Sequence, residues 1–341
     1  MQKYLLFCFI FAFCSCAKPL HNTTAITLPF DVDNYKTLNL NKYPCICLDN
    51  KVEIGMVKSM KIVDSNLFIH SSAGLHLFSL NTGDLKTRYS RKGQGPEEYI
   101  TLWSYNIADT VVQLYDMNRK RILEYSIIGK FIRTIDIQTF FSEKPFQDFI
   151  EIGDNYLGKR VFRGDSDIPE LALYDKNFRY QEDVLPELKL RSGLMLHKPF
   201  SLNSEGKALY CRYFDNVIYE IGLDSAKPIY FIDFNRNSFN SKGKFKDEYD
   251  IIEHINSSRT KYAVNFSDIQ EDKNYLSFNY LYNSSKRMAM YNKNEGVTYS
   301  FAPISETESI NQIYRLDNFL YILTQSDNGI TKLYKCKFSD N

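Results

Sequence analysis

The 341-residue sequence predicts an all-β fold, a six-bladed β-propeller, from three observations. Aromatic residues make up 15% of the chain, and the tyrosines lie among Leu, Ile and Val in short runs, as half-buried strands prefer. Two patterns each recur six times, at a typical spacing of about 45 residues. Four-stranded units of that length, repeated in a ring, are typical of a β-propeller.

The first repeated pattern is a polar turn followed by an apolar strand, and the second is an aromatic residue in a later strand. The acidic turn residues are Asp64, Asp109, Asp154, Glu205, Asp272 and Asp317. The aromatic residues are Phe78, Tyr125, Tyr174, Tyr219, Tyr291 and Tyr334. Both series lengthen between the fourth and fifth copies, so a single insertion of about 25 residues explains both irregularities.

The sixth copy has no residues left for an outermost strand. Residues 35–50 precede the first copy and are long and apolar enough to supply it. We therefore expect the N-terminal segment to close the sixth blade beside the C-terminus. The expected division is a signal peptide at 1–15, a tether at 16–34 and a propeller at 35–341.

The insertion between blades 4 and 5, at about 241–258, predicts a helix over 243–256. Phe245, Tyr249 and Ile252 fall on one side of it at helical spacing. Such a helix must pack this stripe against something. It is expected either to cover the edge of the ring or to form a lid over the central mouth.

The N-terminus has the character of an export signal. Lys3 precedes an apolar stretch at 4–13, which is too short to cross a bilayer as a permanent helix. The following "FCSC" looks like the lipobox of bacterial lipoproteins, which implies acylation of Cys16 and anchoring to a membrane. Ala17 in place of Asp favours the outer membrane, facing the periplasm. The alternative is ordinary secretion with cleavage nearby.

A resemblance joins these features. The lipobox, the six TolB-like or NHL-like repeats and the loop "GQGPEEY" at 93–99 together resemble the six-bladed β-propeller lipoproteins of Gram-negative anaerobes. The resemblance covers nearly the whole mature chain and implies a fold and a location. It implies no settled activity.

Charge and motifs exclude several function classes. Net charge is +1, so no general field favours nucleic acid, and no nucleic-acid partner is expected. The sequence holds no G-x-S-x-G, H-E-x-x-H or P-loop motif, and its histidines have no metal-ligand spacing. Innermost strands such as "VKSMKIV" and "FQDFIEI" are poor in inward acids, which favours binding over metal-assisted catalysis. No metal or cofactor is expected.

Four cysteines follow the signal: Cys45, Cys47, Cys211 and Cys336. An oxidising compartment permits a disulfide, and a closing N-terminal strand would place Cys45 or Cys47 beside Cys336. A bridge from one of them to Cys336 is therefore one expectation. The alternative is that all four are small buried side chains.

The loop "RKGQGPEEYI" at 91–100 holds two glycines but lacks the signature of a phosphate-binding loop. Pro96 and Glu97 follow the glycines, so we interpret it as a connector between blades 1 and 2. Its glycines are expected to adopt backbone angles closed to other residues. Connector loops and second-to-third turns share one face of a propeller, and their candidate ligand-binding residues are Arg91, Lys92, Gln94, Glu98, Arg119, Arg121, Arg163 and Arg287. The alternative is that most of these charges are merely solvated.

The predicted function is therefore a membrane-anchored periplasmic lipoprotein that acts as a binding or protein-interaction module for glycan or anionic ligands. The alternative is a propeller hydrolase or lyase that acts on glycan or lactone substrates.

Overall fold

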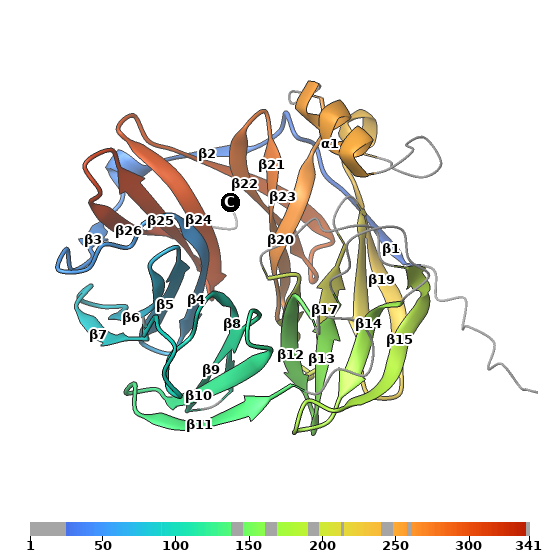
Figure 1. Cartoon of the computed structure of the whole chain (residues 1–341). Helices are drawn as coiled ribbons and strands as arrows, with labels where there is room; N and C mark the ends of the chain where they lie inside the picture. Colours follow the sequence, from blue (N-terminus) through green and yellow to red (C-terminus); the bar gives the residue numbers. More distant parts are fainter. Residues whose placement is uncertain are drawn as a thin grey trace, which may run out of the picture.

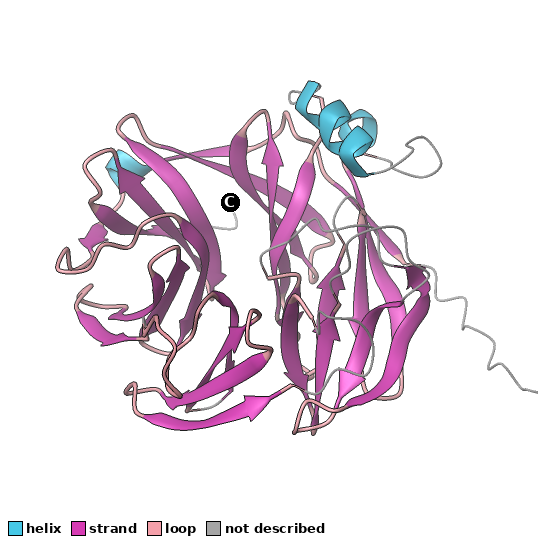
Figure 2. Cartoon of the chain, viewed as in Figure 1, coloured by secondary structure: helices cyan, strands magenta, loops and turns pink. Residues whose placement is uncertain are grey.

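The computed structural model is a ring of six β-sheets, so the predicted six-bladed propeller is confirmed (Figure 1). The structure describes residues 25–89, 91–108, 110–137, 146–160, 169–189, 198–212, 215–239, 248–257 and 261–338. Strands make up most of these residues, and the α-helix lies outside the ring of sheets (Figure 2).

Blades 1 to 3 each consist of four antiparallel strands in chain order, with the first strand nearest the axis (Figure 1). Blade 1 contains β4 (Val57–Val63), β5 (Asn66–Ser71), β6 (Gly74–Ser79) and β7 (Leu85–Arg88). Blade 2 contains β8 (Leu102–Ala108), β9 (Val111–Asp116), β10 (Arg121–Ser126) and β11 (Phe131–Asp136). Blade 3 contains β12 (Asp148–Ile152), β13 (Asn155–Lys159), β14 (Pro169–Tyr174) and β15 (Tyr180–Lys189).

Blades 4 to 6 each include one strand from the N-terminal segment, which is a fifth strand in blades 4 and 5 and the fourth strand in blade 6. Blade 4 contains β16 (Phe200–Leu202), β17 (Ala208–Cys211), β18 (Val217–Ile221), β19 (Ala226–Asp233) and β1 (Ile26–Pro29). Blade 5 contains β20 (Val264–Glu271), β21 (Tyr275–Tyr282), β22 (Ser285–Asn292), β23 (Val297–Ile304) and β2 (Lys36–Asn39). Blade 6 contains β24 (Glu308–Leu316), β25 (Phe319–Ser326), β26 (Thr331–Lys337) and β3 (Cys45–Cys47). Short 3-10 turns lie at Leu40–Lys42 and Asn235–Asn237.

The N-terminal segment closes the sixth blade, as expected, because β3 pairs antiparallel with β26. It also does more than the sequence indicated. β1 and β2 add parallel to β19 and β23, so the segment runs along the outer edges of three successive blades. β1 lies within residues 16–34, which the sequence assigned to a tether.

Both repeated sequence patterns fall at equivalent places in the blades. The acidic residues that the structure describes lie in the turns between first and second strands, and the aromatic residues all lie in third strands. Asp64 and Asp317 adopt φ values of 54° and 50°, a left-handed conformation that Asp tolerates better than most residues. The turn chemistry and the strand pattern therefore agree throughout the ring.

The core is divided among the interfaces between adjacent blades. Six buried clusters each draw on two neighbouring blades in the part of the chain that the structure describes. The cluster between blades 6 and 1 contains Leu323 and Leu333 from the last blade and Met60 and Ile62 from the first. Burial of this apolar surface closes the ring without a covalent link.

The insertion contains α1 (Glu248–Ser257), within the predicted region. Ile251 is buried against Phe239 and Val264 at the start of blade 5, so the helix packs on the edge of the ring. The predicted stripe of Phe245, Tyr249 and Ile252 lies outside the described side chains. Across the described residues, the helices all fall short of the length and apolar character needed to cross a bilayer.

The four described cysteines are free thiols, so the predicted bridge is not formed. The strand register explains why. Cys45 and Cys47 lie opposite Tyr334 and Lys332, two and four residues before Cys336. Cys336 and Cys211 are buried, whereas Cys45 and Cys47 are exposed, so the alternative of four buried cysteines also fails.

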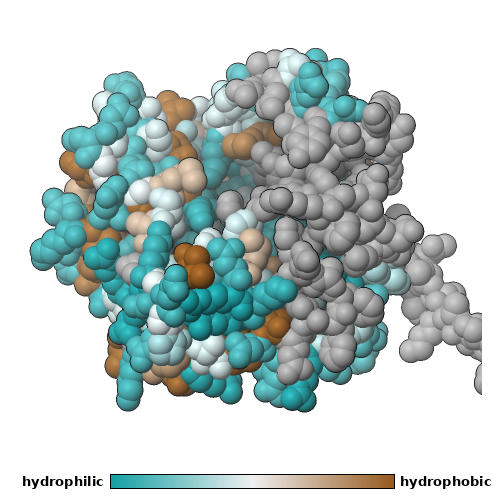
Figure 3. Space-filling view, in the orientation of Figure 1, coloured by the Kyte–Doolittle hydropathy of each residue, from teal (hydrophilic) through white to brown (hydrophobic). Residues whose placement is uncertain are grey.

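The visible surface is largely hydrophilic outside the grey residues, with small separate apolar areas (Figure 3). This part of the molecule therefore shows no broad apolar patch of the kind that marks a protein interface.

Candidate functional site

The connector loop, residues 91–100, joins β7 to β8 and is held by its own contacts. Glu98 turns back over the loop, and its carboxylate accepts a hydrogen bond from the backbone N–H of Gly95 at 2.8 Å. A Cβ atom at Gly93 would lie 2.0 Å from Glu98 Oε2. Neither Gly93 nor Gly95 has a left-handed φ, so the expectation about their backbone angles was wrong. Gly93 instead leaves room for the Glu98 carboxylate.

Two arginines that were candidates for ligand contact bind this loop instead. Arg121 donates to the carbonyl oxygens of Glu98 and, at 3.2 Å, of Gly95. Arg119 donates to the same Gly95 oxygen at 3.2 Å. Arg91 pairs with Glu97 at 2.5 Å. Their polar groups are therefore engaged in fixing the connector.

The other sequence candidates are dispersed. Lys92 donates to the Ser72 carbonyl oxygen at 3.1 Å, and Gln94 is exposed on the loop. Arg287 is buried, donates to the Val32 carbonyl oxygen at 2.6 Å and lies 4.2 Å from the ring centre of Tyr35. It thereby fastens the segment between β1 and β2. Arg163 and Cys16 lie outside the described residues.

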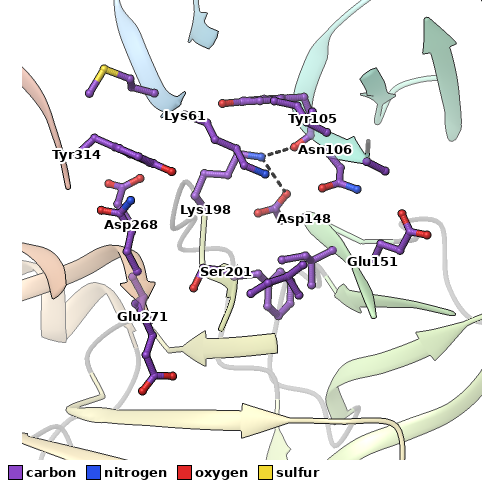
Figure 4. Close-up of a pocket in the computed structure, with 18 of the residues that line it drawn as sticks. Lys61, Tyr105, Asn106, Asp148, Glu151, Lys198, Ser201, Asp268, Glu271 and Tyr314 are labelled. Atoms are coloured by element: carbon purple, nitrogen blue, oxygen red, sulfur yellow. Dashed lines mark hydrogen bonds and ion pairs between the residues drawn. The ribbon is translucent and has the colours of Figure 1, made fainter. Parts of the chain in front are cut away.

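The structure brings a different set of residues together, around a central cavity of about 700 Å³ (Figure 4). Each blade contributes charged or phenolic side chains from its innermost strand or the residues just before it. We call the following six residues the cavity cluster: Lys61, Tyr105, Asp148, Lys198, Asp268 and Tyr314. One comes from each blade, in the order 1 to 6.

The cavity extends to the face that carries the turns between first and second strands. Its walls include Gly153, Gly206, Asp272 and Asp317, all of which lie in those turns. The sequence placed its candidate site on the opposite face, where the connector loop lies. The described cavity therefore opens among the acidic turns of the first repeated pattern.

Lys198 precedes β16 and is held in place by two neighbours. Its Nζ lies 3.9 Å from Asp148 Oδ1, donates to the carbonyl oxygen of Tyr105, and sits 3.9 Å from the centre of that ring. Its φ is 59°, a left-handed value that is unusual for lysine and stores strain. Burial lowers the pKa of Lys198, and the nearby Asp148 and Asp268 oppose that shift.

Lys61 approaches from blade 1, across the axis from Lys198 of blade 4 (Figure 4). Its ammonium group makes no hydrogen bond or ion pair with any residue that the structure describes. Burial, reinforced by the like charge of Lys198, lowers the pKa of Lys61 to about 8, while Asp148 acts in the opposite direction. Lys61 is therefore a partly desolvated amine that faces open volume.

Asp268 is directed into the cavity by an irregularity in β20. The pairing with β21 passes from Ser267 opposite Asn279 to Gln270 opposite Ser277, which leaves one extra residue in β20. Asp268 has a φ of 52° in this bulge. Burial raises the pKa of Asp268 above its usual range, although Lys286, Ser267 and Asn279 favour the carboxylate. Bulges and strained backbone of this kind often re-aim side chains at functional sites.

Two tyrosines complete the cluster. Burial raises the pKa of Tyr105 and of Tyr314, so both phenols stay protonated near neutral pH. Tyr314 donates to the carbonyl oxygen of Ile62 at 3.4 Å. The rings thus provide apolar walls beside the two lysines.

The acids nearer the mouth are paired within the chain. Glu271 accepts from Lys293 at 2.6 Å and from the Tyr230 hydroxyl at 2.8 Å. Asp272 pairs with Arg315 at 2.6 Å. The described residues contain no group of three or more His, Cys, Asp or Glu arranged to hold a metal ion.

Comparison with known proteins identifies the family. A family described as a domain of unknown function, DUF4934, matches residues 50–337. The chain belongs to this family. A search of curated proteins found no match.

Solved structures share the fold at low sequence identity. A protein of Bacteroides fragilis NCTC 9343 described as exported is 16% identical, with a TM-score of 0.67 over 93% of this chain and 100% of its own. A DUF4221 family member from Bacteroides vulgatus is 11% identical, with a TM-score of 0.57 over 87% and 97%. Virginiamycin B lyase from Staphylococcus aureus is 12% identical, with a TM-score of 0.52 over 87% and 99%. These likenesses concern the fold alone.

The sequence reasoning missed the cavity cluster because its members are single residues on separate blades. The clearest available signal was Lys61, one of two lysines in the innermost strand "VKSMKIV" and the one between Met60 and Ile62. Asp148 could be recognised in "FQDFIEI" by the same reasoning. Asp268 could not, because only the bulge turns its side chain toward the axis.

Proposed function

We propose that this propeller is an exported lipoprotein that binds a small anionic, hydroxyl-rich ligand in its central cavity. The carrying observation is Lys61, a partly desolvated ammonium group without a described partner that faces a cavity of about 700 Å³. A cavity of this size lies within the range of small-molecule sites, roughly 300–1,000 Å³. A buried charge that no internal partner compensates is costly unless a ligand or water meets it.

The polar groups in the cavity favour an acid that also bears hydroxyl groups. Lys61 and Lys198 supply two ammonium groups for a carboxylate. Ser201 Oγ has no hydrogen-bond partner among the described residues and can serve a hydroxyl group. Tyr314 offers an aromatic wall, which suits the apolar side of a sugar ring. A uronic acid released from a glycan has this combination of features.

Export and anchoring rest on the N-terminal sequence. The apolar stretch at 4–13 and the "FCSC" that ends at Cys16 support acylation and attachment to the outer membrane, facing the periplasm. Metabolic labelling with a fatty acid tests this directly. Label should enter the wild-type chain and be absent from Cys16→Ala. Equal labelling of both would reject the anchor.

Binding is tested by calorimetry on the full-length lipoprotein in detergent, with glucuronate, glucose and glucosamine as probes. Glucuronate should bind more tightly than the neutral and cationic sugars. Lys61→Met should lose this preference, whereas Lys92→Met on the connector loop should keep it. Equal weakening by both variants, or no preference for the acid, would contradict a cavity site for anions.

A second candidate, a hydrolase or lyase for glycan or lactone substrates, is favoured by one observation. Asp268 and Lys61 have pKa values displaced in opposite directions, which is the usual basis for acid and base roles in one site. Turnover of uronic acid oligomers or lactones that disappears in Asp268→Asn would support this candidate. If these substrates were recovered unchanged, the hydrolase or lyase candidate would be rejected and the binding function would be retained.

A further inference from the structure

Lys61 lacks the internal partners that hold several other buried or half-buried lysines of the described chain. Lys286 donates to the carbonyl oxygen of Asn311 and to Gln312 Oε1 at 3.4 Å. Lys159 lies 3.3 Å from Glu170, and Lys198 is held by Asp148 and Tyr105. Lys61 lines the central cavity without any such contact. It is therefore free to react with a molecule in the cavity.

We propose that Lys61 is a nucleophile that condenses with the carbonyl group of an aldehyde or keto acid in the central cavity, forming an imine. This inference rests on the proposed function, because the cavity must first bind a small acid. It adds a reaction and narrows the ligand class to acids that carry a reactive carbonyl group. Uronic acids in their open-chain form belong to that class.

Lys198 can orient such a ligand. Asp148 and Tyr105 fix its ammonium group near that of Lys61, although the two side chains start from opposite blades (Figure 4). A ligand carboxylate bound to Lys198 would therefore place a nearby carbonyl carbon toward Lys61 (Figure 4). Because the contacts with Asp148 and Tyr105 hold this group in place, binding needs little further ordering.

The state of the Lys61 amine suits this chemistry. Only the neutral amine attacks a carbonyl group, and a lysine with an ordinary pKa of about 10.4 is roughly one part in a thousand neutral at pH 7.5. A pKa of about 8 leaves a substantial neutral fraction at the same pH. Desolvation beside a second cation is a recognised way to activate a lysine nucleophile.

The reaction balances without an oxidant or reductant. The Nζ lone pair forms a bond to the carbonyl carbon, and the C=O π electrons move to oxygen, which takes up a proton. Loss of a proton from nitrogen gives the neutral carbinolamine, whose hydroxyl group takes up a second proton and leaves as water. The nitrogen lone pair forms the C=N bond as water leaves, and loss of the remaining N–H proton gives the neutral imine. Asp268 can donate the proton that lets the hydroxyl group leave and then accept the last N–H proton, because burial favours its protonated form and the bulge directs it into the cavity.

The test uses the full-length lipoprotein with glyoxylate as the probe and cyanoborohydride to reduce any imine. The reduced adduct is a carboxymethyl group, which intact mass and peptide mapping locate. At pH 7.5, Lys61 should be labelled at least about tenfold more than the average lysine, given the difference in neutral fraction. Lys61→Arg should lose this preferred adduct. Lys130→Arg, a substitution at an exposed lysine, should retain it.

Labelling spread evenly over the lysines of the wild-type chain would overturn the inference, and this outcome needs no variant to fold. Excess glucuronate should protect Lys61 from labelling by glyoxylate. If it did not, the reactive amine would lie outside the glucuronate site, and the proposal would be rejected. Glucuronate binding without preferred labelling would reject only the imine. Absence of both binding and labelling would reject the proposed function as well.

Discussion

Charged side chains gather at two places in this propeller, the connector loop and the central cavity. The two places differ in whether these side chains have partners within the chain. At the loop, Arg119 and Arg121 donate to backbone carbonyl oxygens, and Glu98 accepts from the loop backbone. In the cavity, Lys61 has no described partner, and Lys198 and Asp268 occupy strained backbone conformations. The charged groups at the loop stabilise the conformation of the loop itself, whereas the cavity retains an ammonium group that can bind a ligand.

This difference shows that the residue type alone does not identify a binding group. Arginines on an exposed loop are more noticeable in a sequence than a lysine in an innermost strand. Yet arginine donors readily satisfy several carbonyl oxygens at once, which makes them suitable for fixing irregular backbone. The presence or absence of internal partners is the better criterion. Substitutions at the two places should therefore separate stability from binding.

The largest effect on ligand binding is expected for Lys61→Met. Glucuronate affinity should fall about 100-fold, because a desolvated charge contact is lost while similar volume is retained. The melting temperature should stay the same or rise, since the folded state no longer has to bury an uncompensated ammonium group. Calorimetry and thermal melts check both parts. A clear drop in the melting temperature would show that Lys61 belongs to the framework.

Arg121→Ala should have the opposite profile. The loop carbonyl oxygens lose their charged donor, and the buried Asp116 carboxylate, 4.0 Å away, loses its neighbour. The free energy of unfolding should fall by about 3 kcal/mol, with little change in glucuronate affinity. Chemical denaturation and calorimetry measure the two quantities. Arg121→Lys, which retains one donor group, should be intermediate; a loss of affinity with unchanged stability would instead assign Arg121 to the ligand.

The sequence predicted the fold well because the propeller is a sum of local, repeated signals. The acidic turns and third-strand aromatics marked six units, and the missing last strand predicted closure by the segment 35–50, in which residues 45–47 form the closing strand. β1 and β2 were missed because short parallel strands added to an outer edge need no turn of their own. Nothing local distinguishes residues 26–29 from a tether.

The candidate site was harder to predict than the fold. It depends on which side chains from six blades meet at the axis and on which of them remain unpaired. Arg287 and Arg121 have the same residue type as a ligand-binding arginine, and only their contacts with Val32 and the connector loop assign them to structure. The bulge at Asp268 is likewise a property of strand pairing.

His76 on β6 is a buried titratable side chain that does not line the central cavity. It tests whether such a group affects stability rather than ligand binding. It is fully buried, and neither ring nitrogen has a hydrogen-bond partner among the described residues. Burial, with Arg88 on the neighbouring strand, lowers the pKa of His76 to about 4 from an ordinary 6.5. The unfolded chain therefore binds a proton between these values that the folded chain does not, and stability is lost as pH falls from 6.5 toward 4.

This contribution should amount to about 2 kcal/mol at pH 5 relative to pH 7. His76→Phe removes the titrating ring and keeps an apolar body of similar size. Denaturation of both proteins at pH 7 and pH 5 isolates the effect, because all other groups titrate in each. Parallel pH profiles for the two proteins would mean that His76 is protonated, and therefore solvated, in the folded state.

The smallest expected effect concerns Gly93, where the loop makes room for its own carboxylate. Gly93→Ala should cost about 1 kcal/mol, because the new Cβ would lie 2.0 Å from Glu98 Oε2 and the side chain must move away from Gly95 N–H. In a Glu98→Ala background the same substitution should cost little, since the clash disappears. Chemical denaturation of the two single variants and the double variant gives the coupling energy. If Gly93→Ala lowered stability equally in both backgrounds, the backbone conformation at residue 93 would require glycine. The Glu98 carboxylate would then not be held against Gly93, and Glu98 would again be a candidate for ligand contact.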